Sequence, residues 1–397
     1  MTDAPTVTGD WLTAPGTQAV MGMLEGAGHR ALVVGGCVRN ALLGAPVADI
    51  DIATDARPER VTALAEAAGF RTVPTGIEHG TVTVIAHGVP HEVTAFRRDV
   101  ATDGRRAVVA FSDRVEEDAA RRDFTMNALY AARDGTLVDP LGGLPDLLAR
   151  RLRFVGTPID RVREDYLRIL RFFRFHAWYA DPAGGIDADA LDACARGAEG
   201  LEGLSAERVG GEMRKVLAAP DPAPALAAMA ASGVLMRVLP GADPAILAPL
   251  VHLEEGRAPS WLRRAAALGG EGLRERWRLS NPEARALDLR LDALALGTPP
   301  EEVAWRHGAE AAMDVALVRA AAGPLPLDPE IPARIAAGAG ARFPLAAADL
   351  MPALSGPALG AALRRAEAAW IASGFRLGRE ALRDRALADG GLSGAGG

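Results

Sequence analysis

The sequence is poor in lysine and cysteine: its 397 residues include one lysine, Lys215, and two cysteines, Cys37 and Cys194. Two isolated cysteines make neither a disulfide framework nor the spacing of a zinc site, which favours a reducing cytoplasm. No uncharged apolar run reaches 18 residues, so we expect no transmembrane helix. The first residues lack a basic segment followed by a long apolar stretch, so we expect no signal peptide and no membrane partner.

An excess of positive charge is also missing. Acidic residues number 51 against 44 basic ones, and the formal net charge is −7. This balance argues against nucleic-acid binding over the whole surface. Any contact with nucleic acid must therefore use a local basic patch. A hydrophobic content of 49% is typical of a globular protein, and the length allows two or more hydrophobic cores.

Residues 31–55 carry the strongest local pattern. Residues 31–34 form an apolar run suited to a buried strand, and Gly35 and Gly36 follow at once. Two glycines after a strand let backbone N–H groups come close to a phosphate, because no Cβ stands in the way. Residues 40–43 predict the start of a helix, whose N-terminus adds positive potential at the same place.

A pair of acids follows the glycines. Asp49 and Asp51 lie on either side of Ile50, ten and twelve residues after Arg39. On a strand these two carboxylates share one face, about 7 Å apart, while Ile50 and Ile52 point into the core. Such a pair suits Mg²⁺, which prefers oxygen ligands. The alternative is a solvated strand edge that carries two acids, and the nearby glycines favour the metal site.

Together these residues resemble the signature of the nucleotidyltransferase superfamily built like DNA polymerase β. In detail the stretch is similar to the class II tRNA nucleotidyltransferase (CCA-adding enzyme) and bacterial poly(A) polymerase family, over about residues 30–217. The resemblance implies an α+β fold, with a polymerase-β-like head of mixed sheet and helices before an all-helical neck, body and tail. The implied domains are a catalytic head (1–140), a nucleotide-selecting neck (141–218) and a tRNA-binding body and tail (219–397).

Further elements of the head are read from periodicity. Helices are predicted at 17–25 and 57–69, the second capped by Asp55, and strands at 71–73, 80–86 and 91–96. Glu92 shares a strand face with Thr94, and the resemblance makes it a candidate third carboxylate; a surface glutamate on an edge strand is the alternative. Residues 97–111 are polar and rich in arginine, so we expect a mobile loop. In the resembling family a flexible loop here accompanies A addition.

A second motif reads RRDFTMNA, and it matches the family's RRDFTxNA block at Arg121, Arg122, Asp123, Phe124, Thr125 and Asn127. The planar fork of Arg122 suits a triphosphate. Asp123 and Asn127, expected one helical turn apart, suit a ribose hydroxyl. A salt-bridged helix is the alternative for the arginines and the aspartate alone.

Residues 161–179 predict one amphipathic helix. Asp165 and Arg168 are neighbours on its polar side, and Arg171 and Arg174 follow at intervals of three. A helix laced with ion pairs is the alternative, but the spacing resembles the family's nucleotide-selecting motif. Cytosine and adenine both present an amino donor beside a ring-nitrogen acceptor, which match a carboxylate and a guanidinium. A good bidentate pair is worth about 1–3 kcal/mol of discrimination.

The rest of the chain carries weaker signals. Residues 204–217 predict a helix capped by Ser205, which resembles a fifth family block and is interpreted as bracing the neck. Residues 220–397 show helical patterns broken at prolines, and residues 388–397 are predicted to be disordered. The sequence indicates neither an oligomeric state nor the residues that dock tRNA.

The resemblance implies template-independent addition of CCA to the 3′ end of tRNA from CTP and ATP, with release of pyrophosphate. Asp49 and Asp51 would hold two Mg²⁺ ions, helped by Glu92, while Asp165 and Arg168 choose the base. Nucleotide binding would involve Gly35, Gly36, Arg39, Arg122, Asp123, Asn127, Arg171 and Arg174. A poly(A) polymerase or an enzyme that adds only the terminal A is the alternative. A catalytically silent RNA-binding relative is a remote one, because both acids are intact.

Overall fold

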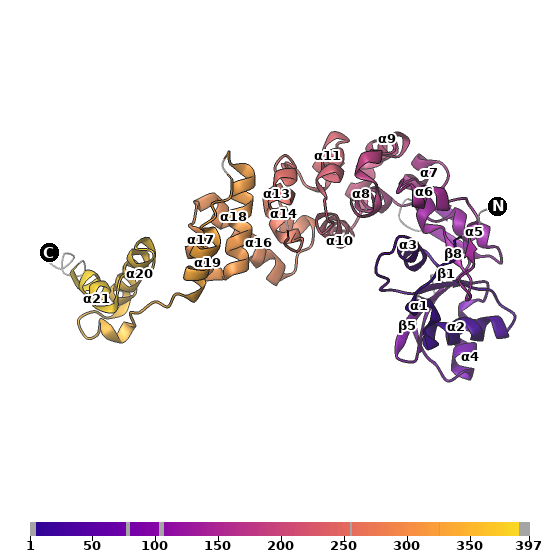
Figure 1. The fold of residues 1–397 in the computed structure, drawn as a ribbon, viewed down its shortest axis with the longest axis horizontal. Helices are drawn as coiled ribbons and strands as arrows, with labels where there is room; N and C mark the ends of the chain where they lie inside the picture. The colour runs from indigo at the N-terminus through magenta and orange to yellow at the C-terminus, as the bar shows by residue number, and fades with distance from the viewer. Residues whose placement is uncertain (1–4, 77–79, 103–106, 255, 325, 389–397) are drawn as a thin grey trace. The chain divides into compact units, whose positions relative to one another are not determined.

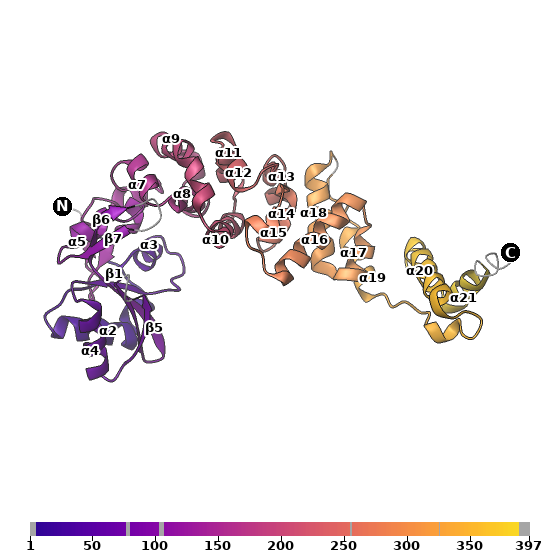
Figure 2. The same ribbon diagram turned by 180° about the vertical axis from the view of Figure 1, so that it is seen from behind.

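The computed structural model describes residues 5–76, 80–102, 107–254, 256–324 and 326–388. The chain divides into two compact units, residues 1–244 with 270–278, and residues 245–269 with 279–397. Figures 1 and 2 show the elements of both units from opposite sides. The expected domain borders at 140/141 and 218/219 both fall inside the first unit, so they stay predictions.

A seven-stranded mixed sheet forms the first part of the N-terminal unit, in the order β3-β4-β5-β2-β1-β8-β9. Among the described strands of this sheet, β2 and β5 are the one pair that runs in parallel. The strands are β1 (Ala31–Val34), β2 (Asp51–Thr54), β3 (Arg71–Gly76), β4 (Thr81–Ala86), β5 (Val89–Ala95), β8 (Tyr130–Ala131) and β9 (Leu137–Val138). Two helices, α2 (Pro15–Gly26) and α4 (Pro58–Ala67), pack against this sheet and against each other, preceded by α1 (Asp10–Thr13).

Several predicted bounds shift in the head. The helix expected from residue 40 is α3 (Gly36–Leu42), because Gly35 at φ 73° turns the chain from β1 straight into the helix. The strand expected to include Asp49 begins at Asp51. Asp55 does not cap α4, whose N-cap is Arg57; instead Asp55 accepts a hydrogen bond from the Arg30 backbone N–H.

The loop predicted at residues 97–111 is wrong for its described part. Residues Arg97–Thr102 (β6) and Ala107–Phe111 (β7) form a two-stranded antiparallel ribbon, and residues 103–106 lie outside the described residues. Cross-strand pairing satisfies backbone groups that a loop leaves to water, and this outweighs the polar composition. The helix α5 (Val115–Ala120) follows the ribbon.

The single helix predicted at 161–179 is two helices. They are α7 (Pro158–Glu164) and α8 (Leu167–Tyr179), separated by Asp165 in an extended conformation (φ −154°, ψ 107°). The capping prediction for Ser205 is confirmed, since its side chain accepts from the Arg208 backbone N–H at the start of α10. Other helices of this unit are α6 (Leu144–Leu148), α9 (Ala188–Gly197), α10 (Ala206–Leu217), α11 (Ala223–Ala231), α12 (Val234–Val238) and α15 (Leu273–Arg276).

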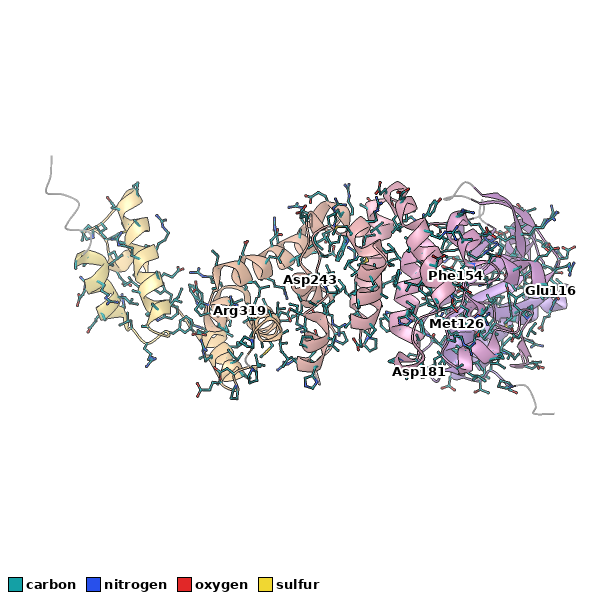
Figure 3. The ribbon with its side chains drawn as sticks, turned by 90° about the horizontal axis from the view of Figure 1, so that it is seen from above. Glu116, Met126, Phe154, Asp181, Asp243 and Arg319 are labelled. Carbon is teal, nitrogen blue, oxygen red and sulfur yellow. The ribbon has the colours of Figure 1, made fainter. Side chains whose placement is uncertain are left out.

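A cluster of phenylalanines joins the RRDFT segment to α8. The ring centroid of Phe124 lies 4.9 Å from that of Phe154 and 5.1 Å from that of Phe175. Phe154 in turn stacks on Phe172 at 5.5 Å. Figure 3 labels Phe154 and Met126, both buried in this unit. Each buried ring contributes about 1.5–3 kcal/mol, so the cluster fixes α8 relative to the RRDFT segment.

The second unit is helical within its described residues, as predicted. Its helices are α13 (Leu247–Leu253), α14 (Trp261–Leu268), α16 (Asn281–Leu296), α17 (Pro300–His307), α18 (Ala309–Ala322), α19 (Ile331–Gly340), α20 (Gly356–Ala372) and α21 (Arg379–Ala388). Arg263 and Arg290 pair with the buried Asp314. Of the segment predicted to be disordered, residues 389–397 lie outside the described residues. No described helix is both long and apolar enough to span a membrane.

Candidate active site

The glycine turn after β1 is faced by two guanidinium groups. A Cβ built on Gly35 would lie 3.4 Å from Nη1 of Arg122, and one built on Gly36 would lie 3.8 Å from Nη2 of Arg39. Gly35 also has φ 73°, a conformation that side chains disfavour. The turn therefore combines close backbone access, the N-terminus of α3 and positive charge, which suits a phosphate-bearing ligand.

The predicted acids gather next to this turn. Asp51 on β2 is the register partner of Glu92 on β5, and the Glu92 backbone N–H donates to the Ile50 carbonyl at 3.1 Å. Glu92 therefore belongs to an interior strand and not to an edge. Asp49 is exposed two residues before Asp51, while Ile50 between them is buried as expected.

The electrostatics of Asp51 fit a bound cation. Burial, then the charges of Glu92 and Asp49, raise the pKa of Asp51 to about 6, although Arg122 acts in the opposite direction. A cation beside these carboxylates would offset their repulsion. Among the described residues, no group of three or more His, Cys, Asp or Glu side chains could hold a metal. Mg²⁺ commonly uses only one or two carboxylates together with substrate phosphates, which fits Asp49 and Asp51.

Asp123 and Asn127 are in contact, as predicted, but they do not lie on one α-helix. Asp123 lies before a short 3₁₀ helix, Thr125–Asn127, which brings Asn127 back to it. The amide of Asn127 donates to Asp123 Oδ1 at 2.9 Å, and Nε of Arg171 donates to Oδ2 at 2.8 Å. Burial alone would raise the pKa of Asp123, but Arg171 and these hydrogen bonds outweigh it and hold the pKa at about 2. Asp123 is thus ionised and fixed between the head and α8.

Arg39 is buried and directed toward α8. Its guanidinium donates to Asn127 Oδ1 at 2.5 Å and to the Tyr179 hydroxyl at 2.8 Å. The same group lies 4.1 Å from the centre of the Tyr179 ring. Arg39 therefore connects the glycine turn to the end of α8. Sequence reasoning missed Tyr179, because a single tyrosine at a helix end carries no signal of a partner 140 residues away.

Asp165 and Arg168, which the sequence predicts to select the base, are adjacent in the chain, but their side chains have separate partners. Nη2 of Arg208 donates to both oxygens of Asp165, at 3.0 and 2.8 Å. Arg168 pairs with Glu164 and donates to the Arg161 carbonyl at 3.0 Å. Glu164 and Arg208 were not predicted for this site; Glu164 adjoins the motif, and Arg208 was placed only in the bracing block.

Arg171 and Arg174, predicted to meet phosphates, both have acidic partners. Arg171 pairs with Asp123, and Nε of Arg174 lies 2.6 Å from Glu212 Oε2. Burial lowers the pKa of Arg174, which Glu212 partly offsets. These arginines therefore belong to a row of ion pairs along α8, which joins this helix to Asp123 and to Glu212 on α10.

Comparisons with known proteins add to this geometry. Residues 31–153 match the poly A polymerase head domain family, and residues 185–246 match the family described as the probable RNA and SrmB-binding site of polymerase A. The CCA-adding enzyme of Geobacillus thermodenitrificans is 36% identical over 78% of this chain and 79% of that protein. The human mitochondrial CCA tRNA nucleotidyltransferase 1 is 43% identical over 48% of this chain. That match covers 44% of the human protein, so the chain spans less than half the length of this relative.

Solved structures agree with the predicted fold class. The Bacillus stearothermophilus CCA-adding enzyme in complex with CTP has a TM-score of 0.69 and 32% identity, over 90% of this chain and 92% of that chain. The Thermotoga maritima CCA-adding enzyme complexed with tRNA has a TM-score of 0.68 at 18% identity and shares the fold. An α+β head followed by helices is thereby confirmed. By its identity to the Geobacillus protein over more than three quarters of both chains, this chain belongs to the family of CCA-adding enzymes.

Proposed function

We propose that this chain is a Mg²⁺-dependent nucleotidyltransferase that adds CCA to the 3′ end of tRNA from CTP and ATP, without a nucleic-acid template. One observation carries the proposal: Asp51 and Glu92 are register partners beside a glycine turn that Arg122 faces. Carboxylates for a cation next to donors for phosphates are the parts that phosphoryl transfer requires. The family relatives are named for this reaction.

Asp49 and Asp51 are the proposed metal ligands, with Glu92 adjoining. A divalent metal held by these carboxylates would supply Lewis acidity at the attacking hydroxyl and would offset phosphate charge. The chain itself positions the triphosphate through the N–H groups of the glycine turn and through Arg122. Asp123 and Asn127 orient each other through their hydrogen bond, and we assign to them the binding of a ribose hydroxyl of the nucleotide. Pyrophosphate leaves as the terminal hydroxyl of the RNA attacks the α-phosphorus.

Base selection is assigned to Asp165 and Arg168. An ionised carboxylate offers about four lone-pair sites. Within the described part of the chain, Asp165 accepts two bonds from Arg208 and one from the Leu167 backbone N–H. We assign the fourth site to the amino group of cytosine or adenine. Nη1 of Arg168 donates to Glu164 and to the Arg161 carbonyl, and Nη2 donates to the Arg121 carbonyl at 3.2 Å. We assign a remaining N–H of this guanidinium to the ring nitrogen of the base, whereas uracil and guanine present an N–H there and are rejected.

The other readings are weaker. Relatives named as CCA-adding enzymes favour complete CCA addition over a poly(A) polymerase or an enzyme that adds only A. A catalytically silent RNA-binding relative would need no acidic residues beside the glycine turn, whereas this chain has both Asp49 and Asp51 there. We divide the chain into a catalytic head (1–140), a nucleotide-selecting neck (141–218) and a tRNA-binding body and tail (219–397). We place the enzyme in the cytoplasm.

Asp51→Ala tests the proposal. With a tRNA transcript that lacks CCA, the variant should lose CTP and ATP incorporation while RNA affinity stays within about twofold of wild type, because only the metal site is removed. Asp55→Ala is the matched control, since Asp55 lies just after β2 and bonds to the Arg30 backbone N–H. Incorporation by Asp51→Ala at the rate of Asp55→Ala would end the proposal.

A further inference from the structure

Two buried side chains, Asp118 and Tyr130, and the half-buried Arg122 form a closed hydrogen-bonded set next to the glycine turn. Tyr130 on β8 donates from its hydroxyl to Asp118 Oδ2 at 2.8 Å. Arg122 donates from Nε to the Tyr130 hydroxyl at 3.0 Å, and from Nη2 to Asp118 Oδ2 at 3.0 Å. The side chain of Asp118 is 2% exposed and Tyr130 is fully buried. Each member of the set therefore bonds to the other two.

These bonds fix the orientation of the Arg122 guanidinium. Nε and Nη2 lie on one edge of the planar group, and both are used by Asp118 and Tyr130. The Tyr130 ring also lies 5.2 Å from the guanidinium carbon. With one edge held from two directions, rotation of the fork is restricted. The opposite edge, which carries Nη1, points away from the pair.

The Nη1 edge faces the site. Nη1 lies 3.4 Å from the place where a Cβ on Gly35 would be, so the absence of that Cβ leaves room beside the guanidinium. The side chain of Arg122 is 23% exposed, so part of it is open to a ligand beside the glycine turn.

We propose that Asp118 and Tyr130 are positioning residues that hold Arg122 with its Nη1 edge toward the β- and γ-phosphates of the incoming nucleotide. This inference rests on the proposed function and adds the two groups that make its triphosphate contact rigid. A buried ion pair alone is poor evidence for stability, and two apolar residues can replace it. Orientation of Arg122 explains why a tyrosine hydroxyl bonds to both charged groups, because this third contact fixes the angle of the guanidinium.

Tyr130→Phe tests the inference, because it removes one hydroxyl and keeps the ring in its packing. Affinities of CTP and CMP are measured by competition against labelled CTP in the presence of Mg²⁺. Hydrogen bonds to charged groups predict a loss of CTP affinity of about tenfold or more. CMP affinity should be unchanged, because CMP lacks the β- and γ-phosphates. Asp118→Asn, whose folding is checked by circular dichroism, should give the same pattern.

A double-mutant cycle separates positioning from a general effect on folding. In an Arg122→Met background, Tyr130→Phe should cause no further loss of CTP affinity, because the positioned group is gone. Asp314→Asn is the control for loss of a buried aspartate, since Asp314 is 1% exposed and pairs with two arginines in the other unit. That control should lower the melting temperature and leave the CTP to CMP ratio unchanged.

An unchanged CTP to CMP ratio in the folded Tyr130→Phe variant would overturn the inference. So would an equal loss of both affinities, or a loss that persists in the Arg122→Met background. Incorporation of CTP and ATP by the wild-type chain tests the proposed function separately. A variant with an unchanged ratio in an active enzyme therefore contradicts only the positioning role.

Discussion

A single nitrogen of Arg208, Nη2, donates to both carboxylate oxygens of Asp165, at 3.0 and 2.8 Å. Asp165 lies at the break between α7 and α8, and Arg208 lies on α10. The pair therefore ties the proposed selector carboxylate to a neighbouring helix. A base that donates to Asp165 has to share that carboxylate with Arg208.

Arg208→Ala should weaken the binding of CTP and ATP without removing catalysis. Asp165 loses the bonds that fix its carboxylate, so we expect KM for CTP and ATP to rise about tenfold while kcat changes less. Steady-state incorporation with each nucleotide measures this split. Arg278→Ala is the control. Arg278 pairs with the exposed Glu207, which lies on α10 next to Arg208, so this variant also removes an ion pair of α10 but leaves Asp165 untouched. A fall in kcat with unchanged KM would contradict the selector role of the pair.

Arg168→Ala should relax the choice of base more directly. Removal of the guanidinium abolishes the donor to the ring nitrogen, which is worth about 1–3 kcal/mol. We therefore expect the ratio of kcat/KM for CTP to that for UTP to fall by about 5- to 150-fold. Competition between labelled CTP and UTP gives this ratio in one reaction. A variant that keeps the wild-type ratio would show that Arg168 does not select the base.

Tyr179→Phe should loosen the connection between the glycine turn and α8. The Tyr179 hydroxyl accepts a hydrogen bond from Arg39, and the bond is lost while the ring remains. We expect the free energy of unfolding to fall by about 1–2 kcal/mol in urea titrations. Tyr166→Phe is the control, because the Tyr166 hydroxyl makes no hydrogen bond with any residue that the structure describes. Equal stability of the two variants would argue against the Arg39 contact.

The depressed pKa of Asp123 predicts a pH dependence of stability. The folded pKa is about 2, and the unfolded pKa is the ordinary 3.8. A lowered pKa contributes stability above pH 3.8 that disappears as the pH falls toward 2; its size at neutral pH is about 2 kcal/mol. The stability difference between wild type and Asp123→Asn should therefore shrink between pH 4 and pH 2. Urea unfolding at pH 7, 4 and 3 measures it, and a pH-independent difference would contradict the assignment.

Local patterns predicted the parts of the fold that depend on neighbouring residues. The apolar run of β1, the buried Ile52 and the Ser205 cap were all readable, because each depends on residues a few positions apart. The contact of Asp123 with Asn127 was also expected, although the predicted helical spacing was not its cause. The family resemblance predicted a mixed sheet, whereas the order of its seven strands was not predicted.

Contacts between distant segments explain what the sequence could not predict. The break at Asp165 interrupts a good helical pattern, and its carboxylate is bound by Arg208, 43 residues later. The Arg171 and Arg174 pairs with Asp123 and Glu212 likewise join separate segments. Periodicity identifies a polar helix face, but it does not show which partner covers that face. The ribbon of β6 and β7 was not predicted, because the arginine and glycine content of residues 97–111 is typical of a loop and not of a strand.

The central claim is that protein groups, with no nucleic-acid template, add C, C and A in order. The most direct measurement is mass spectrometry of a tRNA transcript that ends before CCA, after incubation with CTP alone, ATP alone, or both. We expect two added cytidines with CTP alone and CCA with both nucleotides. With ATP alone, the amount of extended tRNA should be negligible compared with the amount formed when both nucleotides are present. A ladder of adenosines with ATP alone, or no addition under any condition, would contradict the account.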